Sequence, residues 1–118
     1  MDPSDLLPLN PRDFLILFAL ADEERHGYGI VRDVERESRG QVRLDPANLY
    51  RSIRRMISTG LVEEAERRPA TTAGGERRRY YRITQFGREV VKREATRLAQ
   101  LTAAARARSL IPGEEAPA

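Results

Sequence analysis

Residues 84–110 constrain the fold most, because they are predicted to form one helix that the rest of the chain is too small to bury. Thr84 is a capping residue, and Pro112 and Gly113 end the helical pattern. At 1.5 Å per residue this helix would be about 40 Å long, which exceeds the width of the preceding domain. Its apolar positions therefore need another surface, and a second copy is the simplest supplier because two-fold dimers are the commonest oligomers. The positions predicted at this interface are Val91, Ala95, Leu98, Leu101, Thr102 and Ala105.

The first predicted helix begins after the capping residue Asn10, with Pro11 at its first position. Residues 14–21 are apolar on every face, so more than one side of this helix must be covered. A second helix is predicted over 27–38 and is closed by Gly40. The residues of the first helix that we expect to join the subunit interface are Phe14, Leu17 and Phe18.

Composition excludes several functional classes. The 118 residues include no Cys and one His, so disulfides, thiolate sites and most multi-imidazole metal sites are excluded, and no cofactor is expected. The apolar run 14–21 is far shorter than the roughly 18 residues of a membrane span, and no signal peptide opens the chain. We therefore expect a cytoplasmic protein with no membrane partner.

Charge is distributed unevenly along the chain. Residues 1–44 carry six basic and nine acidic side chains, whereas 45–60 carry three basic and one acidic. Arg provides 20 of the 21 basic residues, and its forked guanidinium suits phosphate and guanine. A genome-wide preference for Arg would give the same ratio of Arg to Lys. A polyanionic partner is therefore one of two explanations for the predominance of Arg.

The third predicted helix has the sharpest boundaries, with Asp45 as cap, Pro46 at the first position and Gly60 just past its end. Its core stripe consists of Leu49, Ile53, Met56 and Ile57. The opposite face is centred on Arg51 and holds no acid, which favours contact with a DNA groove over a solvated surface. The residues of this helix predicted to contact DNA are Ala47, Asn48, Tyr50, Arg51, Arg54 and Arg55.

Two strands are predicted over 61–65 and 78–83, joined by a turn-forming stretch with Arg on both sides. We expect a hairpin with a mobile, basic tip; a surface hairpin that uses Arg for solubility is the alternative. Two helices, a basic helix and a basic hairpin, in this order, predict a winged helix-turn-helix. The residues of this wing predicted to contact DNA are Arg67, Arg68, Arg77, Arg78 and Arg79.

Several short motifs occur along the chain in a characteristic order. They are His26-Gly27-Tyr28-Gly29-Ile30, Leu49-Tyr50 followed by Ile53, Met56 and Gly60-Leu61-Val62, and Arg78-Arg79-Tyr80-Tyr81-Arg82-Ile83-Thr84 with Gly87. Together they resemble the PadR-like family of bacterial transcriptional regulators over about residues 12–100. The resemblance implies a mainly α (α+β) fold: a winged helix-turn-helix over 1–83, a single dimerisation helix over 84–111 and a flexible tail over 112–118.

The resemblance also implies a function. Family members are typically repressors released from operator DNA by small molecules, so we expect a homodimer on an inverted repeat of double-stranded DNA, with a small-molecule effector. This chain has Asn48 before the Leu49-Tyr50 pair and Arg51 after it, where the family usually has Thr and Pro. These two side chains are able to read adenine and guanine edges.

Two other functions are alternatives to DNA binding. A winged helix used as a protein–protein interaction module would bury its hairpin or third helix in a partner and bind no DNA. A small hydrolase would need a general base, nucleophile or metal cluster that these residues do not supply, so no enzyme activity is expected. We expect His26 to cap or pack at a helix start, and Tyr28 to pack.

Overall fold

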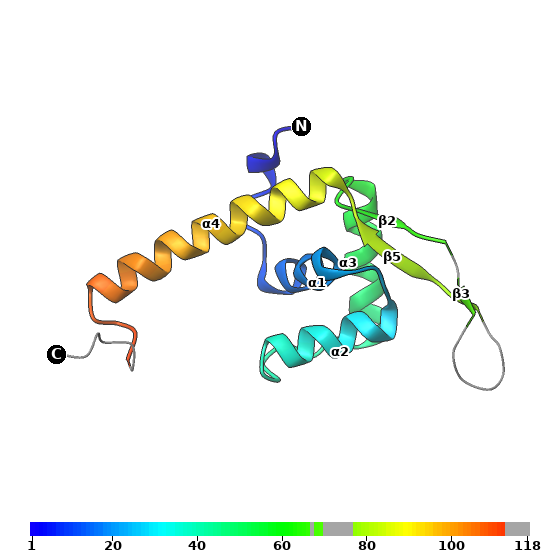
Figure 1. Cartoon of the computed structure of the whole chain (residues 1–118), viewed down its shortest axis with the longest axis horizontal. Helices are drawn as coiled ribbons and strands as arrows, with labels where there is room; N and C mark the ends of the chain where they lie inside the picture. The colour runs from blue at the N-terminus through cyan, green and yellow to red at the C-terminus, as the bar shows by residue number, and fades with distance from the viewer. Residues whose placement is uncertain (67, 70–76, 113–118) are drawn as a thin grey trace.

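The helices begin where their capping residues predict. The computed structural model describes residues 1–66, 68–69 and 77–112. In each α-helix the side chain of the capping residue accepts a hydrogen bond from the backbone N–H three residues later; these caps are Asn10, His26, Asp45 and Thr84. The elements in chain order are the 3₁₀ helix η1 (Pro3–Leu6), α1 (Pro11–Asp22), β1 (Arg25–His26), α2 (Gly27–Glu37), α3 (Pro46–Ser58), β2 (Val62–Glu64), β3 (Arg68–Pro69), β4 (Arg77–Arg78), β5 (Tyr80–Ile83) and α4 (Gln85–Ala107). This order confirms the predicted mainly α, winged helix-turn-helix fold (Figure 1).

The wing is built on a small antiparallel sheet with the strand order β1-β5-β2. Val62 pairs with Ile83 in the predicted hairpin, and Arg68 pairs with Arg78 further along it. The edge strand β1, which pairs Arg25 with Tyr81, was not predicted because two residues carry no alternation pattern. Of the predicted turn over 67–76 and the predicted tail over 112–118, residues 67, 70–76 and 113–118 lie outside the described residues.

The core lies around α1, which contacts α2, α4 and β5. Ile16 and Leu17 have no exposed surface, and Leu20 is nearly as buried. The prediction that Leu17 faces a partner subunit is therefore wrong. Val91, at 8% exposed, likewise belongs to the core of its own chain. The chain itself covers most of the apolar surface of α1, and Phe18 remains 45% exposed.

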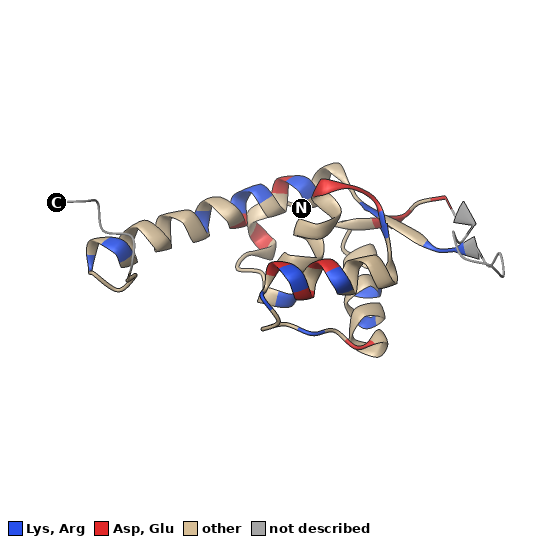
Figure 2. Cartoon of the chain, turned by 60° about the horizontal axis from the view of Figure 1, so that its bottom comes forward, with Lys and Arg blue, Asp and Glu red and all other residues tan. Residues whose placement is uncertain are grey.

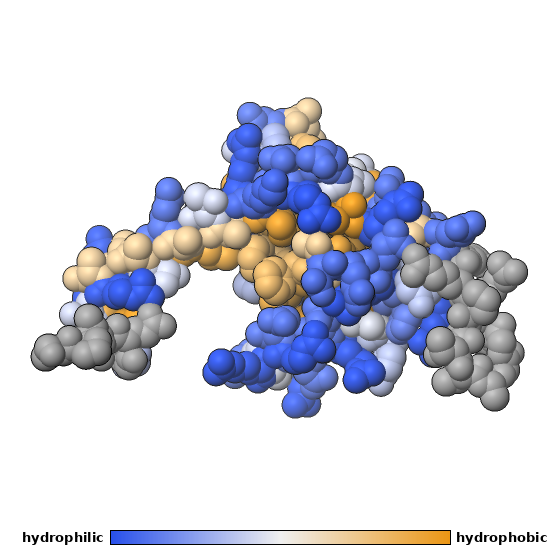
Figure 3. Space-filling view, viewed as in Figure 1, coloured by the Kyte–Doolittle hydropathy of each residue, from blue (hydrophilic) through white to orange (hydrophobic). Residues whose placement is uncertain are grey.

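The long helix α4 crosses over α1 and then continues beyond the other elements (Figure 1). Its N-terminal part carries the buried residues Val90, Val91 and Glu94. Towards its C-terminal end, Leu98 and Leu101 are exposed, and the space-filling view shows an apolar band along this part of the helix (Figure 3). The helix ends at Ala107 rather than near Leu110, because Ser109 adopts a positive φ and the Leu110 amide bonds back to Ala105.

An N-terminal segment that the sequence did not predict lies against α4. The Leu9 amide donates to the buried Glu94 carboxylate at 2.8 Å, and Arg93 donates to Ser4 Oγ at 2.7 Å. Arg97 also donates to Glu94, and these hydrogen bonds hold the pKa of that carboxyl below its ordinary value. The buried charge of Glu94 is thereby paired, as burial of a carboxylate requires.

Gly87 lies where α4 meets the loop before β2. A Cβ at this position would overlap the Leu61 carbonyl, which belongs to the backbone and cannot turn away. Gly87→Ala should therefore lower the free energy of unfolding by about 1–3 kcal/mol, measured by urea denaturation.

Gly29→Ala is the matched control, because Gly29 holds the same position in α2 that Gly87 holds in α4. The nearest atom to its added Cβ, apart from the adjacent residues and the backbone of its own helix, would be a ring carbon of His26 at 3.5 Å. This variant should be neutral or gain up to about 1 kcal/mol. Equal losses in both variants would contradict the assigned role of Gly87.

Candidate nucleic-acid interface

The outer face of α3, formed by Ala47, Tyr50, Arg51, Arg54 and Ser58, is exposed along its whole length. It lies opposite the core residues Leu49, Ile53 and Met56, as the helical period predicts. Ile57 was predicted in the core stripe but is 39% exposed. Within the described part of the chain, Arg51 and Arg54 form no ion pair, so both guanidinium groups are available to an anion. Figure 2 shows basic residues and no acidic residue along α3, and Asp45 precedes the helix as its N-cap.

Three polar side chains are linked at the N-terminal end of this face. The Asp45 carboxylate accepts from the Asn48 side-chain amide at 3.0 Å, and Asn48 Oδ1 accepts from Arg51 at 3.1 Å. Asn48 is half-buried and uses both ends of its amide in these contacts. The amide of Asn48 keeps a second N–H and a second lone pair for a base, and Arg51 uses one of its five donors in this contact.

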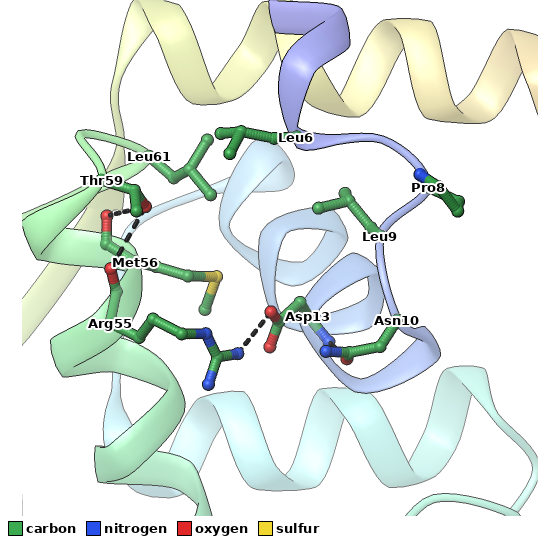
Figure 4. A pocket seen from close by; sticks show the side chains of 9 residues that line it. All are labelled: Leu6, Pro8, Leu9, Asn10, Asp13, Arg55, Met56, Thr59 and Leu61. Carbon is green, nitrogen blue, oxygen red and sulfur yellow. Dashed lines mark hydrogen bonds and ion pairs between the residues drawn. The ribbon is translucent and has the colours of Figure 1, made fainter.

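Arg55, which the sequence predicted to contact DNA, is also exposed on α3, but its guanidinium already has a partner within the chain. Its guanidinium turns towards α1 and donates to the Asp13 carboxylate at 2.5 Å (Figure 4). Asp13 is 7% exposed, so it needs this cation for charge pairing. The sequence placed Asp13 in the first turn of α1 but gave no signal that Arg55 would meet it, because the two residues are far apart along the chain.

Tyr50 lies against the start of α2. A Cβ on Gly27 would come within 2.7 Å of the Tyr50 hydroxyl oxygen, so the absence of a side chain at Gly27 makes room for this ring. The Tyr50 side chain nevertheless keeps 40% of its surface exposed. Together with His26, Tyr28, Arg78 and Arg79, these two residues line a polar cleft of about 260 Å³ beside α3.

Each ring nitrogen of His26 lies within hydrogen-bond distance of another group. Nδ1 accepts from the Gly29 amide at 3.1 Å, which confirms the predicted capping role, and Arg78 Nη1 lies 2.9 Å from Nε2. A neutral imidazole that accepts at Nδ1 carries its proton on Nε2, so that proton faces the donors of Arg78. The Arg78 guanidinium thus lies against His26 at the cleft beside α3.

The other wing arginines differ in availability. Arg79 forms an ion pair with Glu64 at 2.8 Å and is half exposed. Arg68 and Arg77 lie in the short β3–β4 ladder, where Pro69 pairs with Arg77. Arg67 lies outside the described residues.

Tyr28 was predicted to pack but is 64% exposed. Its ring stacks on His26, and the Arg32 guanidinium lies 5.7 Å from its centre. Tyr28 lines the cleft beside α3, whereas Arg32 is not part of its lining. The helical spacing of Tyr28 and Arg32 was the available signal, because residues four apart lie on one helix face.

Two kinds of site are absent from the described residues. They contain no group of three or more His, Asp or Glu side chains placed to hold a metal ion. Nor do they include a helix with the length and hydropathy to span a bilayer.

Comparison with known proteins agrees with this arrangement. A family model described as the transcriptional regulator PadR-like family matches residues 16–93. An uncharacterized 37.1 kDa protein in transposon TN4556 of Streptomyces fradiae is 39% identical over 93 residues, which are 79% of this chain and 24% of that protein. The chain thus spans about a quarter of the length of this relative.

Two solved structures share the fold. A PadR family transcription regulator from Clostridium difficile is 23% identical with a TM-score of 0.66, covering 80% of this chain and 94% of its own. A PadR-like transcriptional regulator from Bacillus cereus is 22% identical with a TM-score of 0.66, covering 86% of this chain and 92% of its own.

The environment of His26 predicts a pH-dependent stability. Burial, followed by the charge of Arg78, lowers the pKa of His26 from its ordinary value of 6.5. The unfolded chain then binds more protons than the folded chain below about pH 6.5, so stability should fall as the pH drops through this region. Urea denaturation between about pH 5 and 7.5 should show this loss, and His26→Asn, which keeps a capping side chain, should reduce it. The same pH dependence in both proteins would contradict the assignment.

Proposed function

The chain belongs to the transcriptional regulator PadR-like family, and on this premise we propose that it is a homodimeric DNA-binding repressor that recognises an inverted-repeat operator. The family is one of transcriptional regulators, and the chain is not an enzyme. The observation that carries the proposal is the outer face of α3, where Arg51 and Arg54 are exposed and form no ion pair within the described part of the chain. Exposed unpaired arginines on a capped helix suit a major groove, where a guanidinium binds guanine through two acceptors.

The wing and the cleft support the same function. Arg78 and Arg79 lie beside Tyr50 and the start of α2, so their donors and those of α3 lie on neighbouring surfaces. Contacts of this kind to phosphate position a protein on DNA without specifying sequence. We assign Arg51 to base recognition and Arg78 and Arg79 to the backbone.

The free part of α4 supports assembly of two copies. Leu98 and Leu101 are 36% and 54% exposed, and towards its C-terminal end the helix continues beyond the other elements (Figure 1). Phe14, Phe18, Ala95, Thr102 and Ala105 complete the proposed interface. Two copies would present two α3 helices to successive major grooves, about 34 Å apart. An effector would act by binding one spacing of these helices better than another.

Selection of DNA by the purified protein from a random pool tests the function. We expect an inverted repeat to be enriched, and Arg51→Ala to cost about 1–3 kcal/mol on the selected site and to relax one base position. Fluorescence anisotropy at several salt concentrations measures both effects.

Arg93→Ala is the control, since Arg93 lies on α4 and bonds to the N-terminal segment rather than facing outward from α3. It should leave the preferred sequence unchanged. Failure to enrich any repeat, together with salt-independent binding to a protein partner, would favour the interaction-module alternative.

Leu101→Glu tests assembly. Placing a charge on the apolar band of α4 should shift the protein from dimer to monomer in analytical ultracentrifugation at micromolar concentration, because the carboxylate would lose water on association. Gln100→Glu, on the opposite side of the same helix, should leave the dimer intact. A monomeric wild-type chain would overturn the proposed homodimer.

A further inference from the structure

Three side chains at the start of α3 form a series of hydrogen bonds that ends at the arginine assigned to base recognition. Asn48 engages both carboxylate oxygens of Asp45. Oδ1 accepts from the backbone N–H of Asn48 at 2.8 Å, and Oδ2 accepts from its side-chain Nδ2 at 3.0 Å. Asn48 Oδ1 in turn accepts from Arg51 Nη1 at 3.1 Å. Residues three apart are neighbours on a helix surface, so the series runs along one side of α3.

The neighbours of Asn48 permit only one orientation of its amide. A carboxylate accepts hydrogen bonds and cannot donate, whereas a guanidinium donates and cannot accept. Nδ2 must therefore face Asp45, and Oδ1 must face Arg51. The carboxylate is itself held in place, because it caps a backbone N–H of the helix. Asn48 is also half-buried, which restricts its side chain further.

The series restrains an arginine that would otherwise move freely in solvent. Arg51 and Arg54 are both exposed on the outer face of α3, but of the two only Arg51 donates a hydrogen bond to a described residue. A side chain that is ordered before it binds loses less conformational entropy on binding. The contact with Asn48 uses one donor of the guanidinium and leaves the others for a base.

The charge of Asp45 has a role in this series that a neutral cap would lack. An exposed carboxylate offsets the positive end of the helix and disfavours phosphate nearby, which is a disadvantage on a DNA-binding surface. Asn or Ser would cap α3 about as well. We propose that Asp45 and Asn48 are positioning residues, which fix the direction of the Arg51 guanidinium and thereby determine how strictly one operator position is selected as guanine. The operator part of this proposal rests on the proposed function, whereas the ordering of Arg51 is testable without DNA.

Asp45→Asn tests the first contact of the series. The new amide keeps an oxygen for the cap but presents an NH₂ group where Asn48 now finds an acceptor. Asn48 must then turn its own amide, which places Nδ2 against Arg51 and breaks their hydrogen bond. Heteronuclear NOE measurements on the arginine Nε–H groups of the free protein check this. Arg51 should be clearly more ordered than Arg54 in the wild type, and the two should be alike in the variant.

DNA binding gives a second readout. Replacement of the selected guanine should weaken wild-type binding by about tenfold, and Asp45→Asn should reduce this discrimination by about fivefold. The affinity of the variant for unrelated DNA should instead rise about twofold, since one negative charge is lost beside the phosphates. A residue needed only for folding would lower both affinities together, and thermal unfolding verifies that the variant folds.

Glu64→Gln is the matched control, because it removes a negative charge beside Arg79 of the wing rather than beside Arg51. It should raise the affinity for all sequences and leave the base discrimination unchanged. In an Arg51→Ala background, Asp45→Asn should cause no further loss of discrimination, since it acts through Arg51.

Three results would each overturn the proposal: equal order of Arg51 and Arg54 in the wild type, unchanged discrimination in Asp45→Asn, or additive losses in the double variant. A wild-type chain that binds no DNA would contradict the proposed function, and the NMR comparison would still decide whether Asp45 orders Arg51.

Discussion

The burial of α1 on several sides is the constraint on which the rest of the structure depends. Ile16, Leu17 and Leu20 are almost completely enclosed by α2, α4 and β5. Full burial of each such side chain contributes about 1.5–3 kcal/mol to the stability of the folded state. Contact with the apolar surface of α1 therefore keeps the covering elements in place. Once these elements are in place, little of the chain is left to cover the C-terminal part of α4. The C-terminal end of α4 therefore stays exposed because the other elements pack around α1.

Two paired buried charges fix how the outer elements meet this core. Asp13 of α1 binds Arg55 of α3, and Glu94 of α4 binds the Leu9 amide and Arg97. Each carboxylate is buried and would be unfavourable without its partner. The first pair couples α3 to α1, which helps to direct Arg51 outward, and the second ties the N-terminal segment to α4.

Much of the fold was predictable because helix boundaries are encoded locally. A capping side chain and a proline at the first position act over three or four residues, so Asp45 and Pro46 identified the start of α3 without any tertiary information. The outward direction of Arg51 followed from helical periodicity for the same reason. The strand β1 and the helix η1 were missed because such short elements carry no periodic pattern.

The candidate interface was only partly predictable. The sequence by itself determined which residues of α3 face away from the core, because the helical period fixes the direction of each side chain relative to the buried ones. It therefore identified Arg51 and Arg54. Only the tertiary structure decided that Arg55 pairs with Asp13, that Leu17 is enclosed by its own chain and that Tyr28 stays exposed. The physical reason is that caps and periodicity act within a few residues, whereas charge pairing and burial depend on which distant segments the fold brings together.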